Sequence, residues 1–332
     1  MIEKYYSGVI EQIYNRIGKE TRNIVMANYS NDFSIENLEV IRRYQSNEDN
    51  VFLAYSEFSY NTLVGAYEPF LDIICNMHRR FIGGSFDDFQ KECGVYYLHR
   101  QVLNSYYETG ECFREETVLL NEVAYEQRRM TMAIADMLKK LSEVKPLMIV
   151  INRFQMASKS SIETIKYLID NPCANIGIVL GVNAIVKGTD STVEVWDRIV
   201  ESLEDRSAIY YIGSAGPLKN NVKTTNDDEL YITMNFEQSI QEASNIMEFL
   251  DFEQARRGCR IIEHKLKFED AWIDEKSLRR FYMVYARTSV LLGEMSKAIE
   301  LTNEYKALIP ENDSEHYLSL YYFMKGTCYM YQ

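Results

Sequence analysis

Prolines and metal-binding cysteine motifs are both scarce in this sequence. It has 5 prolines in 332 residues, and its 6 cysteines form no Cys-x-x-Cys pair and have no histidine at ligand spacing. This spacing argues against a zinc site and against a disulfide framework. We therefore expect no bound metal and free, mostly buried thiols. The cysteines are Cys75, Cys93, Cys112, Cys173, Cys259 and Cys328.

Positive charge and long apolar runs are also lacking. Lysine and arginine number 36 against 49 aspartates and glutamates, which gives a formal net charge of -13 at pH 7. Nucleic acids are held largely by lysine and arginine, so direct nucleic-acid binding is not expected. The amino terminus has no charged leader before an apolar segment, and no stretch approaches about 18 uncharged apolar residues. These absences predict a cytoplasmic protein without a membrane segment.

The residues that are present predict two folded domains. Hydrophobic residues make up 46% of the chain and charged residues 26%, a balance typical of globular proteins. Up to Asn235, short apolar runs alternate with amphipathic patterns, which favours a mainly parallel sheet covered by helices on both faces. We predict strands at 23–27, 51–55, 147–151, 176–180, 208–212 and 230–234, helices at 5–19, 34–44, 63–81 and 160–169, further helices within 86–144, and an exposed loop at 213–228.

Beyond this α/β domain, assigned to residues 1–235, the pattern of residues 236–332 is helical throughout. Five residues there follow the spacing of a tetratricopeptide-like repeat, with small residues where two helices pack closely. Such repeats need a polar capping helix, so a chain that ends in Cys-Tyr-Met-Tyr-Gln is expected to be truncated at its C-terminus. The repeats are expected to bind a protein or peptide, and a mere spacer is the alternative. The five residues are Tyr282, Ala286, Gly293, Ala298 and Pro310.

A degenerate phosphate loop follows the first predicted strand. A P-loop reads G-x-x-x-x-G-K-[ST], because glycines let the backbone curl around phosphates while the lysine and the hydroxyl contact phosphate and magnesium. Here the stretch that starts at Ala27 has Asp32 for glycine, Phe33 for lysine, and Ser34 as its one match. A carboxylate about 4 Å from a phosphate charge costs on the order of 4 kcal/mol at an effective dielectric of about 20. We therefore expect no triphosphate to bind, although a plain strand, turn and helix with a good N-cap is the simpler alternative.

The strand predicted at 147–151 also lacks the acids that a nucleotide site needs. NTPases of this type follow a buried strand with acidic residues that hold magnesium and polarise water. Asn152 and Arg153 stand at those positions. Magnesium therefore has no anchor there, and no cofactor is expected.

Two stretches together point to a known family. Residues 146–183 resemble the strand, D-D-L-Q-W-A-D, helix and strand segment of the STAND class of signal-transduction ATPases, which are AAA+-like P-loop proteins. Residues 67–74 resemble the Y-x-P helix that follows the second strand in that class. The class includes bacterial transcription activators with tetratricopeptide-like repeats. The resemblance covers roughly residues 5–235 and implies a P-loop fold that works as a nucleotide-driven switch, from which both eroded motifs depart.

These observations predict a non-catalytic regulatory or scaffold fragment of a signal-transduction or transcription-regulatory protein. The resemblance implies that an output module follows the repeats. One alternative is an active ATPase or GTPase switch with a non-standard site, in which Ser30, Ser34 and Arg153 contact phosphate. A second alternative is a small-molecule sensor that uses the remnant pocket. The sequence leaves the partner and the signal open, and an oligomer is compatible with it.

Overall fold

The structure is a computed structural model, and the residues it describes form two compact units. The first unit comprises Met1–Tyr60, Tyr67–Arg100 and Arg129–Thr225, and the second comprises Asn61–Ala66, Gln101–Arg128 and Asn226–Gln332. The described residues are 2–21, 23–29, 38–46, 50–59, 63–114, 121–183, 209–211, 235–268, 273–310 and 314–331.

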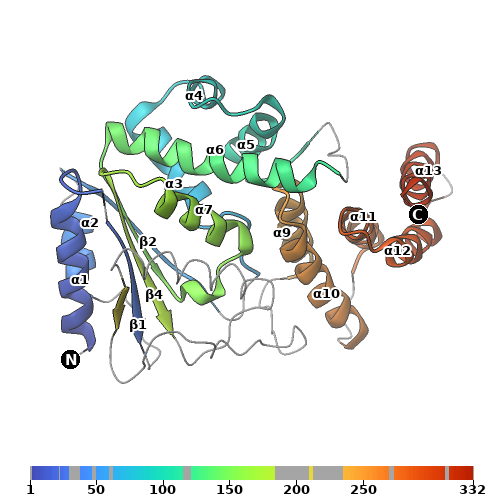
Figure 1. Cartoon of the computed structure of the whole chain (residues 1–332). Helices are drawn as coiled ribbons and strands as arrows, with labels where there is room; N and C mark the ends of the chain where they lie inside the picture. Colours follow the sequence, from blue (N-terminus) through green and yellow to red (C-terminus); the bar gives the residue numbers. More distant parts are fainter. Residues whose placement is uncertain are drawn as a thin grey trace. The chain divides into compact units, whose positions relative to one another are not determined.

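A five-stranded parallel sheet forms the centre of the first unit (Figure 1). Its strand order is β2-β3-β4-β1-β5, and this confirms the α/β class with a parallel sheet. Five predicted strands are present, whereas the strand predicted at 230–234 and the loop predicted at 213–228 lie outside the described residues. The strands are β1 (Ile24–Tyr29), β2 (Phe52–Glu57), β3 (Leu147–Asn152), β4 (Ile176–Asn183) and β5 (Ile209–Tyr211).

Helices cover both faces of this sheet. The helices α1 and α2 lie on one face, and α3 and α7 lie on the other (Figure 1). Right-handed crossovers explain this division, because the chain moves one way from β1 to β2 and the opposite way from β2 through β3 to β4. The helices from the N-terminus to β4 are α1 (Ile2–Arg16), α2 (Glu39–Ser46), α3 (Phe70–Met77), a π-helical turn (His78–Ile82), α4 (Phe86–Glu92), α5 (Tyr97–Thr109), α6 (Val123–Val144), a 3-10 turn (Phe154–Met156) and α7 (Lys159–Asp170).

The helix predicted at 63–81 is wrong in its first part. The α-helix begins only at Phe70, and Tyr67 before it has a left-handed backbone with φ 56°. Pro69 supplies the reason, since it cannot donate a helical hydrogen bond and it disfavours helical geometry at Glu68. The apolar spacing of residues 63–69 comes from burial without a helix.

The core of the first unit lies on both sides of β3, whose six residues are all buried. Such continuous burial is expected for a central parallel strand. Gly177 at the start of β4 admits α1 closely, because a Cβ there would lie 2.7 Å from Cδ1 of Ile17 and 2.8 Å from Cγ2 of Ile13. The core beneath α1 and α2 includes Tyr6, Val9, Ile10, Ile13, Val25, Ala27, Ile41, Leu53, Met148, Val150 and Val179.

The second unit is mainly helical, and its described residues include no strand. Its consecutive helices pack against one another, and α11 also contacts α9. No helix in the described part of the chain is both long enough and apolar enough to cross a membrane. The helices are α9 (Phe236–Glu248), α10 (Phe252–Phe268), α11 (Glu275–Leu291), α12 (Met295–Ala307) and α13 (Ser314–Met330).

Two earlier chain segments also belong to the second unit. The Gln254 side chain on α10 donates a 3.0 Å hydrogen bond to the Val64 carbonyl. Gly258, one turn further along α10, lets Leu63 approach, since a Cβ would lie 2.7 Å from Cδ2 of Leu63. Asn245 on α9 accepts a 2.9 Å hydrogen bond from the Cys112 amide. The helical unit therefore includes residues 61–66 and 101–128 as well as the chain beyond the predicted boundary near Asn235.

Candidate functional site

The strand order indicates that a ligand would bind at the edge of the sheet formed by the carboxyl ends of the strands. From β1 the chain passes to β2, the outermost strand on one side of the sheet, and then returns through β3 to β4, which lies beside β1. In open parallel sheets, ligands bind outside the carboxyl ends of the strands where the order reverses. Here this position is the β1/β4 pair, whose last paired residues are Tyr29 and Asn183. The two degenerate motifs follow β1 and β3 and therefore belong to this edge.

The phosphate-loop positions are only partly described. Ala27 lies inside β1, paired with Gly181 of β4 and Tyr210 of β5, so the strand extends two residues beyond the predicted end. Its side chain is fully buried, and its carbonyl accepts a 3.1 Å hydrogen bond from the Tyr6 hydroxyl. The other predicted positions, Asp32, Phe33, Ser34 and Ser30, lie outside the described residues.

Asn152 and Arg153 lie at the carboxyl end of β3. Asn152 is the last residue of the strand, is fully buried, and accepts a 3.2 Å hydrogen bond at its carbonyl from the Phe58 amide. Arg153 has a left-handed backbone with φ 55° and caps the 3-10 turn. The structure thus places a neutral amide and a cation at the two positions where the resemblance implies acids.

The Arg153 side chain is engaged by the neighbouring strand. Its Nη1 lies 3.0 Å from Oε1 of Glu57, the last residue of β2, and donates a 3.4 Å hydrogen bond to the Phe58 carbonyl. Glu57 also accepts a hydrogen bond from the Tyr55 hydroxyl. The two charged side chains are 21% and 17% exposed, so they compensate each other in a partly desolvated place. An ion pair thus occupies this edge between β2 and β3.

A buried serine cluster near this edge was missed by the sequence analysis. The Ser158 hydroxyl caps α7 and lies 3.0 Å from the Ser160 hydroxyl. Ser160 accepts a 3.0 Å hydrogen bond from the Tyr67 amide, and the Ser161 hydroxyl donates a 2.7 Å hydrogen bond to the Glu68 carbonyl. The cluster therefore fixes the turn before α3. The sequence pattern predicted only a helix at 160–169 in this stretch.

The residues that fit the repeat spacing lie on α11, on α12 and in the turn between them, except Pro310, which follows α12. Ala286 on α11 and Ala298 on α12 are buried, and Gly293 between the helices has φ 76°. Leu292 and Gly293 close the end of α11 with hydrogen bonds to the carbonyls of Thr288 and Val290. Small residues and a left-handed glycine thus produce the predicted pair of helices with a tight turn.

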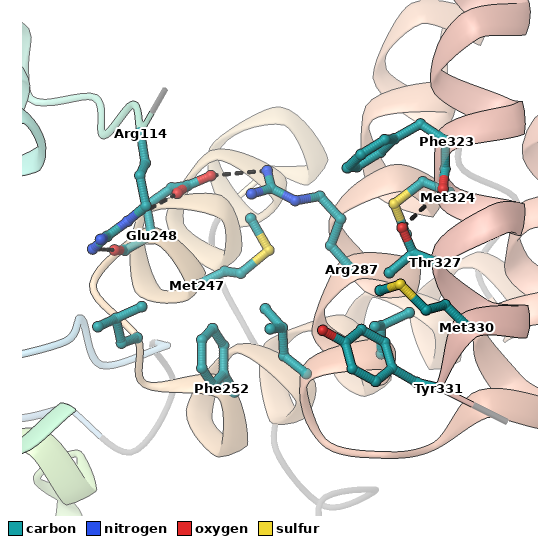
Figure 2. Close-up of a pocket in the computed structure, with 13 residues that line it drawn as sticks. Arg114, Met247, Glu248, Phe252, Arg287, Phe323, Met324, Thr327, Met330 and Tyr331 are labelled. Atoms are coloured by element: carbon teal, nitrogen blue, oxygen red, sulfur yellow. Dashed lines mark hydrogen bonds and ion pairs between the residues drawn. The ribbon is translucent and has the colours of Figure 1, made fainter. Parts of the chain in front are cut away.

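The second unit also contains a pocket (Figure 2). It is lined by residues of α9, α10, α11 and α13, their connections, and Arg114. Glu248 at the end of α9 contacts two arginine side chains. Its Oε1 lies 2.9 Å from Nη1 of Arg287, and its backbone carbonyl lies 3.0 Å from Nη2 of Arg114. Burial lowers the pKa of Arg114, while the charges of Glu248 and Glu126 oppose this shift. No residue of this pocket was singled out by the sequence analysis.

Within the described ranges, no group of three or more histidine, cysteine, aspartate or glutamate side chains is arranged to hold a metal ion. The cysteines described are free, and burial raises the pKa of the Cys75 and Cys93 thiols to about 12. Such thiols stay protonated near neutral pH and are poor nucleophiles and poor metal ligands.

The chain matches no protein-family model, and no curated protein is similar enough to match it. A functional interpretation therefore depends on the geometry of the sheet edge and of the helical unit.

Proposed function

We propose that this chain is a non-catalytic regulatory or scaffold protein. In this proposal the α/β unit is a P-loop-like domain of the STAND type that has lost its nucleotide chemistry, and the helical unit binds a protein or peptide. The ion pair between Arg153 and Glu57 is the observation that carries the proposal. A cation paired internally at the end of β3 cannot hold magnesium, and its partner acid is neutralised by it.

Three further observations support this proposal. The strand order reverses at the β1/β4 pair, as a nucleotide-binding sheet requires. The sequence at Asp32 and Phe33 puts an acid and an aromatic ring where phosphate needs glycine and a cation. The net charge of -13 disfavours direct binding of nucleic acid. A transcription-regulatory or signalling role remains part of the proposal through the family resemblance.

Thermal unfolding with nucleotides tests the loss of nucleotide binding. ATP, GTP and ADP are each added at millimolar concentration with magnesium, and the free energy of unfolding is compared with that of the chain alone. A site filled at about 100 times its dissociation constant adds about 2.7 kcal/mol of stability. We expect no change with any of the three nucleotides.

The active-switch alternative makes the opposite prediction with the same measurement. If Arg153 is a phosphate contact, ATP or GTP stabilises the wild type and the Arg153→Ala variant loses that stabilisation. Arg280→Met, a change at an exposed arginine on α11, is the matched control for a general effect of charge. The proposal would be overturned if a nucleotide stabilises the wild type and Arg153→Ala removes that stabilisation.

A further inference from the structure

The pocket of the helical unit has a size that suits one small group. Its volume is about 170 Å³. An apolar cavity of roughly 150 Å³ accommodates benzene, whereas pockets for drug-sized ligands span about 300–1,000 Å³. The pocket therefore matches a single ring or a branched aliphatic group and is too small for a nucleotide.

The walls of the pocket are mostly apolar. Phe252 of α10 and Tyr331, just after α13, lie on one side of it, and Met247 of α9 lies near its centre in the view of Figure 2. Phe323 and Met330 of α13 also line it, and they are 55% and 67% exposed. An apolar ligand therefore gains contact with buried side chains while these two residues keep one side within reach of solvent.

The charges at the pocket are two arginines and one glutamate. In Figure 2 the guanidinium of Arg287 and the carboxylate of Glu248 point toward each other beside the apolar side chains. Arg287 is 30% exposed and reaches Glu248 through Nη1, the one nitrogen of this side chain with a hydrogen bond among the described residues. Glu126 is buried and acts electrostatically on Arg114, but it does not line the pocket.

Arg114 is the least satisfied of these groups. Its side chain is 2% exposed, and its Nε lies 3.9 Å from Oε2 of Glu248, too far for a hydrogen bond. Nε and Nη1 have no hydrogen-bond partner within the described part of the chain. Buried donors without partners cost free energy, and a guanidinium forms strong paired hydrogen bonds with carboxylates. The lining residues carry one net positive charge, which the Glu126 carboxylate opposes, and Arg114 has unused donors.

We infer that this pocket binds a small organic monocarboxylate whose apolar body is about the size of a phenyl ring. The carboxylate pairs with the Arg287 guanidinium, and the ring packs among Phe252, Met247 and the side chains of α13. A free acid fits better than a peptide segment, because the cavity encloses a single group. This ligand site is distinct from the sheet edge and goes beyond the proposed function, so nucleotide binding does not affect its test.

The test uses 3-phenylpropanoate as the probe and 3-phenylpropan-1-ol as its uncharged match. Calorimetry gives both affinities with the full chain, and methyl NMR of methionine locates the site. We expect the signals of Met247, Met324 and Met330 to shift while those of Met137 and Met148, buried in the first unit, stay in place. The alcohol should bind about tenfold or more weakly, the typical effect of losing a charged hydrogen bond.

Variants on α11 give a second readout. Arg287→Met should weaken 3-phenylpropanoate about tenfold or more, while Arg280→Met on the same helix leaves the affinity unchanged. Leu291→Trp, which fills the pocket from its wall, should abolish binding without removing any charge. Equal binding of the acid and the alcohol, absence of the three methionine shifts, or binding only of a phenylalanine-terminated peptide would each overturn the inference.

Discussion

The guanidinium of Arg153 lies 3.0 Å from the carboxylate of Glu57 and joins the carboxyl ends of β3 and β2. Asp or Asn at position 153 would accept the left-handed backbone found there, with φ 55°, because these residues adopt that conformation more readily than most. Substitutions to these two residues therefore separate the electrostatic role of Arg153 from its backbone geometry.

Arg153→Asp should lower the free energy of unfolding by about 1–3 kcal/mol, since it removes the pair and puts two carboxylates close together. Arg153→Asn should cost less, because it adds no repulsion. Adding Glu57→Gln to Arg153→Asp should restore part of the loss. Urea unfolding of the four proteins measures these differences, and an Arg153→Asn variant as stable as the wild type would show that the ion pair contributes nothing.

Close packing of α1 on β4 predicts a sensitive glycine. A Cβ at Gly177 would lie 2.7–2.8 Å from atoms of Ile17 and Ile13, so Gly177→Ala should cost roughly 1–3 kcal/mol from overpacking. In an Ile17→Ala background the same change should cost less, because the two close atoms of Ile17 are gone and only Cγ2 of Ile13 remains. A double-mutant cycle from denaturant unfolding gives the coupling, which we expect to be at least about 0.5 kcal/mol. Additive effects would contradict the close approach.

The amide of Asn245 should be essential to the helical unit. It accepts a hydrogen bond from the Cys112 amide at 2.9 Å and donates one to the Gly110 carbonyl at 3.0 Å. Asn245→Leu leaves both backbone groups without this partner and should cost about 2–4 kcal/mol. Asn245→Asp keeps the acceptor, so its free energy of unfolding should lie between those of the wild type and Asn245→Leu.

Gln241→Ala is the matched control for Asn245, one turn earlier on α9. Its side chain donates a 2.9 Å hydrogen bond to the same Oδ1 of Asn245, and its half-buried position makes a cost below about 1 kcal/mol the expected result. Hydrogen exchange of the Cys112 amide reports the local effect. Unchanged exchange in Asn245→Leu would refute the assigned role.

Alkaline pH should destabilise the first unit through its buried thiols. Burial raises the pKa of the Cys75 thiol from 9.0 to about 12. Between these values the unfolded chain loses the proton and the folded chain keeps it, so stability is full below about pH 9 and falls as the pH rises. The slope for one thiol is at most about 1.4 kcal/mol per pH unit. Cys75→Ala should reduce the slope measured by urea unfolding between about pH 8 and pH 11, and an unchanged slope would contradict the pKa shift.

Local sequence predicted the strands well because each is a short apolar run. The run 147–151 is nearly the whole of β3, and its continuous hydrophobicity matches a strand buried on both faces. The helix predicted at 63–81 was wrong at its start. Pro69 argues against a helix there, but the helical spacing of the apolar residues favours one. The repeat pattern around Gly293 produced the expected helix pair, because small residues and a left-handed glycine are local requirements.

The candidate sites were predicted unevenly. Asn152 and Arg153 could be placed at a strand end from the sequence, but the Glu57 partner of Arg153 is about a hundred residues away and became visible only through the pairing of β2 with β3. The pocket around Arg114 and Glu248 left no motif. Its residues come from distant segments, so no spacing along the chain could reveal them.

Most strands and helices, and the charges at the strand ends, can be read from local periodicity and turn chemistry along the chain. Folding in three dimensions is what joins residues 61–66 and 101–128 to the helical unit and brings Arg114 to Glu248. Such contacts depend on hydrogen-bonding groups and apolar surface that become neighbours after folding. Packing in three dimensions selects these partners, and the order of residues along the chain carries no direct record of them.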